Sequence, residues 1–223
     1  MKNLRKIFIS SIILIVIGIL GLAITLPMVS WDTTQNNPGI GMGHMFRNLF
    51  RNQENINLDF DEVENLTEKY LEENNLSNLK ISEIMEFSQN FYIELIEEDT
   101  GVGAIELLVD KSSGAIFPEY GPNMMWNLKY GMHSRMSLSR SSIDMSIDED
   151  EALDIAGKYL SKINTGESAG KDIEKFYGYY TIHTETENGE VAGMMSVNGY
   201  TGQVWYHNWH GIFIDMVEIN DME

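Results

Sequence analysis

The chain of 223 residues contains no cysteine, only four prolines and only 15 lysines and arginines. The lack of cysteine excludes a disulfide scaffold, a thiolate metal site, a cysteine nucleophile and lipid attachment through a cysteine. The hydrophobic share of 43% is ordinary for a folded protein and argues against a wholly disordered chain.

Basic residues are scarcest after the N-terminus. All 34 acidic residues follow residue 26, whereas Lys2, Arg5 and Lys6 precede it, so residues 27–223 carry a formal charge of −22 from 12 basic and 34 acidic residues. Such a surface repels phosphates, which predicts that the protein binds no nucleic acid. It attracts cations or basic partners, although an acidic surface also simply keeps a secreted domain soluble.

One long apolar run is present, at residues 7–26. It contains no charge, and its 20 residues match the thickness of a bilayer core as a helix. Basic residues precede it and none follows until Arg47, so the positive-inside rule predicts a single-pass membrane protein with a cytoplasmic N-terminus and an extracytoplasmic C-terminal part. A cleaved signal peptide is the alternative, but its apolar core is usually shorter, about 7–15 residues.

Two later stretches repeat one pattern at a shift of 89 residues. Residues 59–71 match 148–160, and each stretch begins with an Asp that is followed three residues later by Glu, the arrangement of a helix capping box. Helical spacing predicts one buried stripe on each helix. The stripes are Val63, Leu66, Thr67, Tyr70 and Leu71 in the first copy and Ala152, Ile155, Ala156, Tyr159 and Leu160 in the second.

Strand patterns follow each helix. Phe87, Phe91 and Ile93 match Phe176, Tyr180 and Ile182, and their even spacing predicts one face of one strand in each copy. After turns at 99–101 and 188–189 the shift becomes 88, with further strands at 105–109 and 115–117 and at 193–197 and 203–205. We therefore predict an α+β fold in which each copy is a helix packed on an antiparallel sheet of three or slightly more strands.

The predicted organisation has six parts. These are a cytoplasmic tail (1–6), a transmembrane helix (7–26), a flexible tether (27–57), repeat 1 (58–131), a linker (132–145) and repeat 2 (146–223).

Each copy resembles the PepSY domain. The resemblance rests on a helix that ends in Lys-Tyr-Leu or its equivalent, an aromatic strand, and a strand end followed by a turn before a short apolar strand. Those strand ends and turns are Val109-Asp110 with Ser113-Gly114, and Val197-Asn198 with Thr201-Gly202. The resemblance covers about residues 58–121 and 147–209. It implies a non-catalytic binding or inhibitory module at the cell surface, whose partner is a protein or peptide such as a separate metallopeptidase.

No pattern of catalytic residues stands out. The five histidines form no His-Glu-x-x-His helix, and the chain has no Gly-x-Ser-x-Gly elbow and no phosphate loop. We therefore predict that the protein is not an enzyme.

Metal binding is the rival interpretation. The chain has 14 methionines, several of them close to histidines, and thioether and imidazole ligands together suit Cu(I). The candidate metal ligands are Met42, His44, Met45, His207 and His210. In the alternative interpretation the methionines are core residues and the rings of His207 and His210, at a strand end, do not converge. Met194, on the strand face opposite the core set, is expected to be exposed.

Residues 121–127 have no aligned counterpart in the second copy. Exposed Trp and Met side chains are favourable in interfaces. Met124, Met125, Trp126 and Trp209 are therefore candidate partner-binding residues, unless residues 121–127 are a strap that joins the two repeats.

Overall fold

The computed structural model describes residues 58–132 and 144–219. The predicted cytoplasmic tail, transmembrane helix and tether lie outside the described residues, as does most of the predicted linker. Within the described ranges, no helix has both the length and the apolar character needed to cross a membrane. The helices are α3 (Phe60–Glu73), α4 (Pro122–Met125) and α5 (Glu149–Ile163). The strands are β1 (Leu79–Phe87), β2 (Asn90–Glu97), β3 (Gly103–Asp110), β4 (Ile116–Pro118), β5 (Ser168–Phe176), β6 (Tyr179–Glu185), β7 (Val191–Asn198), β8 (Val204–Tyr206) and β9 (Phe213–Glu218).

The two long helices begin where the repeat predicts. Asp59 caps α3 in a complete capping box: its carboxylate accepts from the Glu62 amide at 2.9 Å, and Glu62 accepts from the Asp59 amide at 3.1 Å. Asp148 caps α5 by accepting from the Glu151 amide at 2.9 Å, which is the Asp half of the predicted capping box. The predicted stripes face the sheet, with Val63, Thr67 and Leu71 buried on α3 and Ala152, Ala156 and Leu160 buried on α5.

The strands form two half-sheets that belong to one hydrogen-bonded order, β8-β7-β6-β5-β3-β2-β1-β9, with β4 paired to β3. The first half-sheet holds β9, β1, β2, β3 and β4, and the second holds β5 to β8. They meet at one parallel pairing, Gly103 with Phe176. A Cβ atom on Gly103 would lie 2.7 Å from the Phe176 ring, so this close approach requires glycine.

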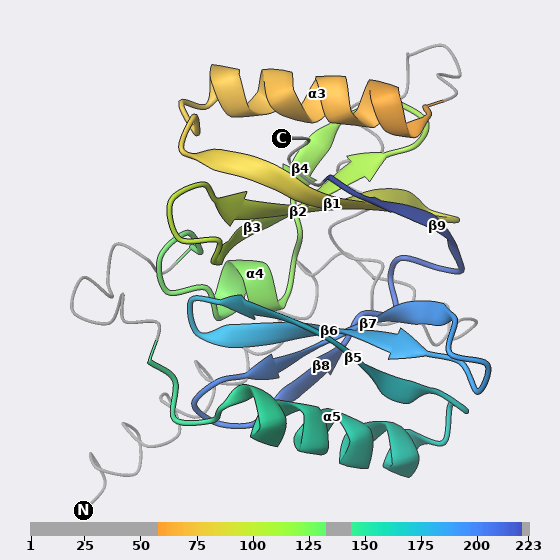
Figure 1. The fold of residues 1–223 in the computed structure, drawn as a ribbon. Coiled ribbons are helices and arrows are strands. Elements are labelled where there is room, and N and C mark those ends of the chain that lie inside the picture. Colours follow the sequence, from red (N-terminus) through yellow and green to blue (C-terminus); the bar gives the residue numbers. More distant parts are fainter. Residues whose placement is uncertain (1–57, 133–143, 220–223) are drawn as a thin grey trace, which may run out of the picture. The chain divides into compact units, whose positions relative to one another are not determined.

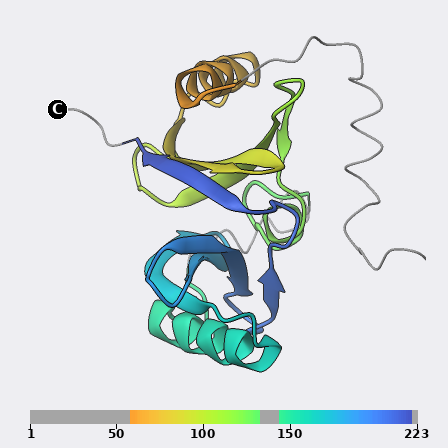
Figure 2. The ribbon, with the colours of Figure 1, turned by 90° about the vertical axis from the view of Figure 1, so that its right-hand side faces the viewer.

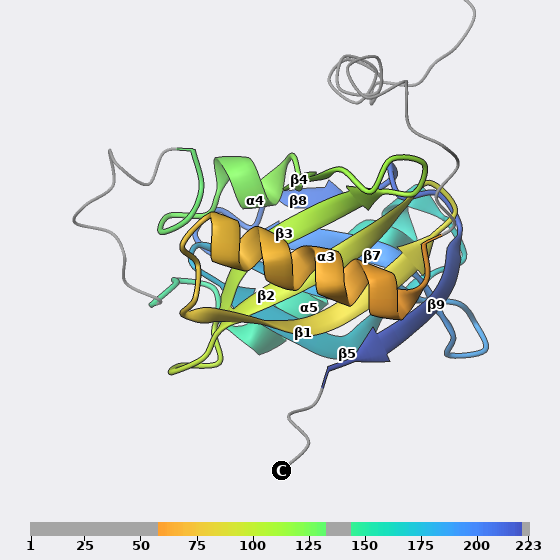
Figure 3. The same cartoon turned by 90° about the horizontal axis from the view of Figure 1, so that it is seen from above.

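The described residues are arranged in layers. Helix α3 covers the outer face of the first half-sheet and α5 the outer face of the second, and the two inner faces lie toward each other (Figure 1 and Figure 2). Seen from above, α3 runs across the strands of its half-sheet (Figure 3). The α+β class and the packing of one helix on each antiparallel sheet are therefore as predicted.

The strand prediction was wrong at one point. Phe87 and Phe91 do not share a strand, because a turn at residues 88–89 separates β1 from β2. Phe91 and Ile93 pack under α3, whereas Phe87 lies in the inner layer. Because the even spacing of Phe87, Phe91 and Ile93 continues across the turn, the periodicity of the sequence could not distinguish two strands from one. Each repeat thus has four strands after its helix.

Strand β9 also departs from the predicted division into repeats. It follows repeat 2 in sequence but pairs antiparallel with β1 of repeat 1, from Glu83 with Glu218 to Phe87 with Phe213. The predicted boundaries at 58–131 and 146–223 therefore do not coincide with the two half-sheets.

Candidate functional site

The layer between the half-sheets is buried but rich in polar groups. Along each inner strand, every second residue points away from the helix, and these positions hold Glu94 on β2, Glu106 on β3, Thr181 on β6 and Ser196 on β7, none more than 4% exposed. A buried polar group is costly unless it is hydrogen-bonded, so this layer is the part of the described structure where function is to be sought.

Two strand ends of the repeats meet in this layer. Glu119 directly follows β4 and donates its amide to Glu106 O at 2.8 Å, and His207 directly follows β8 and donates its amide to Met194 O at 3.0 Å. Glu119 and His207 are 88 residues apart, as are Glu106 and Met194, so these are equivalent positions under the repeat shift. Equivalent backbone positions thus place a carboxylate from repeat 1 opposite an imidazole from repeat 2.

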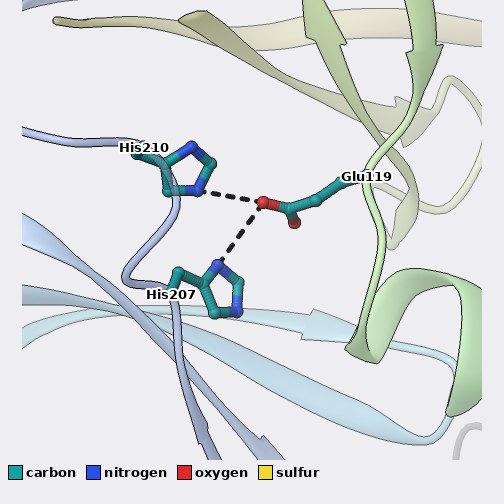
Figure 4. A group of neighbouring side chains, drawn as sticks. All are labelled: Glu119, His207 and His210. Carbon is teal, nitrogen blue, oxygen red and sulfur yellow. Dashed lines mark ion pairs between the residues drawn. The ribbon is translucent and has the colours of Figure 1, made fainter. Parts of the chain in front are cut away.

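His210 completes a cluster around the Glu119 carboxyl (Figure 4). Glu119 Oε1 lies 2.9 Å from His210 Nε2 and 3.5 Å from His207 Nδ1. One ligand atom from each residue lies within 4.8 Å of the others, and all three side chains are buried. Contrary to the alternative stated above, the two histidine rings converge, with centroids 5.8 Å apart.

Each member of the cluster also contacts a neighbouring side chain outside the cluster. His210 Nδ1 lies 2.9 Å from Asn90 Oδ1, an acceptor, which places the proton on Nδ1 and leaves Nε2 with its lone pair. His207 Nε2 lies 2.9 Å from Ser196 Oγ, and the Trp209 indole donates to Glu119 Oε1 at 3.1 Å. Trp209 also stacks on the His207 ring at 4.6 Å. These contacts fix the orientation of all three groups.

The two inward ring nitrogens face the Glu119 carboxyl alone. Apart from this carboxyl, His207 Nδ1 and His210 Nε2 are enclosed without a hydrogen-bond partner. Burial lowers the pKa of His210 to about 3 and lowers the pKa of His207 well below its usual value. Burial raises the pKa of Glu119 to about 8, although hydrogen bonds with Trp209 and Glu106 act in the opposite direction. Burial therefore favours the neutral form of all three groups.

A second buried carboxyl lies beside the cluster. Glu106 accepts hydrogen bonds from the hydroxyls of Tyr92 and Thr181 at Oε1, at 2.9 and 2.8 Å, and from that of Tyr179 at Oε2, at 2.7 Å. Its pKa is raised to about 8 because burial and the nearby Glu119 charge outweigh these hydrogen bonds. Two of its donors come from the second half-sheet, so this network also joins the repeats.

An acidic cleft of about 540 Å³ opens between the half-sheets. His183 Nε2 lies 3.2 Å from Glu83 Oε1 at its wall. Burial by itself lowers the pKa of His183. The hydrogen bond and the charge of Glu83 raise this pKa by more, so that the net pKa of His183 lies above its usual value. Burial and the Glu174 charge raise the pKa of Glu94, and burial and the Glu83 charge raise that of Glu174. The charged residues that line the cleft are Lys80, Glu83, Glu94, Lys171, Asp172, Glu174 and Glu218, with His183.

The structure brings together only some of the predicted metal ligands. His207 and His210 come together, while Met42, His44 and Met45 lie outside the described residues. The third group at the cluster is a carboxylate rather than a thioether, and a carboxylate suits Cu(I) poorly. Met194, expected to be exposed, is fully buried because the inner face of its strand is covered by the other half-sheet.

The candidate partner-binding residues differ in exposure, with Met124 and Trp126 partly buried. Trp126 contacts Trp205 and Tyr179 at ring distances of 5.8 and 6.5 Å, and Trp209 is 9% exposed. Met125 is the exposed member, at 52%. Helix α4 and the residues after it therefore contact both half-sheets, as the strap interpretation predicts, and Leu128 donates its amide to Tyr177 O at 2.8 Å.

Sequence reasoning missed Glu119 and Glu106. The signal for Glu119 was present, because the 88-residue shift aligns it with His207, but a single Glu after a short strand indicates no function by itself. Glu106 aligns with Met194 at the 88-residue shift, on the strand face opposite the core set, where a Glu is expected to be solvated.

Comparisons with known proteins add little to this geometry. No family model matches the chain, and no curated protein matches it. A solved structure, the Bacillus megaterium YpeB C-terminal domain, is similar over 66% of this chain at 11% sequence identity and a TM-score of 0.24. The match spans 61% of that chain, which is less than two thirds. A likeness at this TM-score supports no argument about fold or function.

Proposed function

We propose that the protein is a non-catalytic, membrane-anchored module of the PepSY type that binds a protein or peptide partner outside the membrane. The sequence supports this through the tandem PepSY resemblance and the apolar run at residues 7–26. The observation that carries the proposal is the acidic cleft between the half-sheets. Carboxyl groups held together there favour a cationic ligand, since a cation relieves their mutual repulsion.

The cleft is suited to a basic segment of the partner. Its volume of about 540 Å³ admits one or two lysine or arginine side chains. Glu83 is only 12% exposed, so a guanidinium or ammonium group that enters the cleft gains a largely buried acceptor there, beside the His183 ring. The partner class implied by the PepSY resemblance is a secreted or membrane-bound metallopeptidase, which the module restrains.

The test uses the full-length chain purified in a mild detergent. A metallopeptidase from the same cell envelope is assayed with and without the chain, and affinity is measured for the peptidase and for an arginine-containing peptide. We expect inhibition, and we expect the triple variant Glu83→Gln, Glu94→Gln and Glu174→Gln to weaken binding at least tenfold, about 1.4 kcal/mol.

The matched control changes exposed carboxylates away from the cleft. Glu68→Gln, Glu98→Gln and Glu187→Gln together replace the same number of carboxyl groups without changing the cleft lining. If this control weakens binding as much as the cleft variant does, the interaction is a general charge effect and the cleft is not the site. No binding of either ligand by the folded chain contradicts the proposal outright.

Cu(I) binding by Met42, His44, Met45, His207 and His210 stays a prediction beside this proposal. The cleft does not depend on it, because none of these five residues lines the cleft.

A further inference from the structure

We propose that Glu119, His207 and His210 bind a divalent first-row transition metal ion such as Zn²⁺, and that this ion joins the two repeats. The ligand atoms are a Glu119 carboxylate oxygen, His207 Nδ1 and His210 Nε2. The proposal rests on the position of these atoms, on the groups that orient them and on their lack of other partners.

The spacing of the ligand atoms fits a shared ion. Zinc lies about 2.0–2.1 Å from imidazole nitrogen and about 2.0–2.2 Å from carboxylate oxygen, so two ligands at right or tetrahedral angles are roughly 2.9–3.5 Å apart. The Glu119 oxygen lies 2.9 Å from one nitrogen and 3.5 Å from the other. The two nitrogens lie within 4.8 Å of each other, so a shared ion requires the two rings to move closer together.

The surroundings resemble the outer contacts of a metal centre. Metal-binding histidines usually engage a hydrogen-bond partner through the ring nitrogen that does not bind the metal. Asn90 holds Nδ1 of His210 and Ser196 holds Nε2 of His207, so in each ring the other nitrogen is free to bind. Apart from the Glu119 carboxyl, neither inward nitrogen has a hydrogen-bond partner, which is unusual for buried ring nitrogens unless an ion or a proton is shared there.

The donor set selects the kind of metal. Two imidazoles and one carboxylate suit Zn²⁺ and neighbouring divalent ions, whereas Mg²⁺ and Ca²⁺ prefer oxygen ligands and Cu(I) prefers sulfur. Glu119 comes from repeat 1 and both histidines follow β8 of repeat 2, so the ion connects the repeats. Because all three side chains are enclosed, the role that fits is structural.

An entry route lies close by. Asn90 and Trp209, which each contact a member of the cluster, line a surface cavity of about 520 Å³. The cluster is thus one side chain below the surface. Trp209 also stacks on His207, so its fluorescence is expected to report binding.

The experiment uses the full-length chain without a histidine tag, purified in detergent and stripped with a chelator. Zn²⁺ is titrated by calorimetry, and Co²⁺ is titrated by visible absorption. We expect one ion per chain, a change in tryptophan fluorescence, a Co²⁺ spectrum of a four- or five-coordinate site and a rise in Tm of roughly 5 °C at 100-fold excess over Kd. Each of Glu119→Gln, His207→Gln and His210→Gln is expected to weaken binding at least 100-fold.

The controls separate this site from the others in the chain. His183→Gln changes a histidine that pairs with Glu83 in the cleft and is expected to leave the affinity for Zn²⁺ within twofold. The variant with Met42, His44 and Met45 all replaced by Ala is also expected to bind normally. Binding that disappears in this second variant and survives in His207→Gln overturns the proposal.

A measurement on the unaltered protein guards against variants that fail to fold. X-ray absorption at the zinc edge is expected to show nitrogen and oxygen neighbours at about 2.0–2.1 Å, with imidazole scattering. A sulfur neighbour, or no stoichiometric binding, refutes the site. Neither result affects the cleft proposal, because the cleft and the cluster share no residue.

Discussion

Glu106 shows how a single buried residue links the two repeats. It is fully enclosed, and three hydroxyls donate to it, from Tyr92 of its own half-sheet and from Tyr179 and Thr181 of the other. The position equivalent to Glu106 in repeat 2 is Met194, which is also fully buried. At this pair of equivalent positions the layer is therefore polar in repeat 1 and apolar in repeat 2.

Replacing Glu106 by Leu is expected to destabilise the protein by about 3 kcal/mol or more, because three buried hydroxyls lose their acceptor at about 1–3 kcal/mol each. Glu106→Gln keeps one acceptor oxygen and is expected to cost less. Urea denaturation measures both. The exposed Glu98→Gln serves as a control and is expected to change stability by less than about 0.5 kcal/mol. Equal effects of Leu and Gln would show that the hydroxyl network contributes little.

The raised pKa of Glu106 also predicts how stability depends on pH. The pKa of Glu106 is about 8 in the folded protein and 4.5 for an unperturbed Glu, so the folded state binds the proton more tightly. The stabilising contribution is therefore complete below about pH 4.5 and is lost as the pH rises through about 8. For the chelator-treated protein we expect Tm to fall between pH 5 and pH 8, and to fall less in Glu106→Gln. A Tm that changes with pH in Glu106→Gln as it does in the wild type contradicts the raised pKa of Glu106, because His207 and His210, whose pKa values are lowered, act on both proteins alike.

At the scale of elements, some helices and turns follow from the local sequence, whereas strand β9 depends on pairing with a distant strand. The caps of α3 and α5 and the turns at Gly114 and Gly202, with φ of +66° and +67°, follow from adjacent residues and were predicted. Strand β9 was not predicted, because its partner β1 lies more than 120 residues earlier in the chain. Its residues are only half-buried, so its sequence does not show a strong alternation.

Strand β9 offers a pair of substitutions that tests its role. Val217 packs against the core beneath α3, whereas Ile214 lies at the bulge in the pairing and is 51% exposed. Val217→Asp is expected to cost about 2 kcal/mol because it places a charge against an apolar core, and Ile214→Asp is expected to be nearly neutral. Thermal melts of both variants measure the difference. Equal Tm values would mean that β9 does not stabilise the first half-sheet.

At the scale of the whole described structure, the repeats are joined by contacts on several sides. Tyr177 of the second repeat donates to Glu97 Oε2 of the first at 2.9 Å, and Lys129 and Tyr130 also bind Glu97. Burial alone would raise the pKa of Glu97, but the hydrogen bonds from Lys129, Tyr130, Thr100 and Tyr177 lower it to about 2. Together with the Glu106 network and β9, these contacts make the stability of each repeat depend on the other repeat.

The two repeats are therefore expected to unfold together. Denaturation followed by far-UV circular dichroism and by tryptophan fluorescence is expected to give coincident transitions, and calorimetry a single peak. Tyr177→Phe removes the hydroxyl that binds Glu97 and is expected to lower stability by about 1 kcal/mol while the single transition remains. Two separate transitions in the wild type would show that the repeats are independent domains.

The sequence by itself determined the parts that depend on neighbouring residues. Caps, apolar stripes and turns repeat at shifts of 89 and 88 residues, and each element's outer face could be assigned because it alternates with the local period. The merging of β1 with β2 shows the limit of that reasoning, since a two-residue turn preserves an even spacing.

Tertiary structure alone decided what lies between the half-sheets. Glu119 approaches His207 and His210 across 88 and 91 residues of sequence, and Glu106 meets Tyr179 and Thr181 across more than 70. In an isolated sheet these inner positions would face water, where Glu, Thr, Ser and His are unremarkable. Only the packing of one inner face on the other buries them, and burial is what changes their pKa values and turns three ordinary side chains into a candidate metal site.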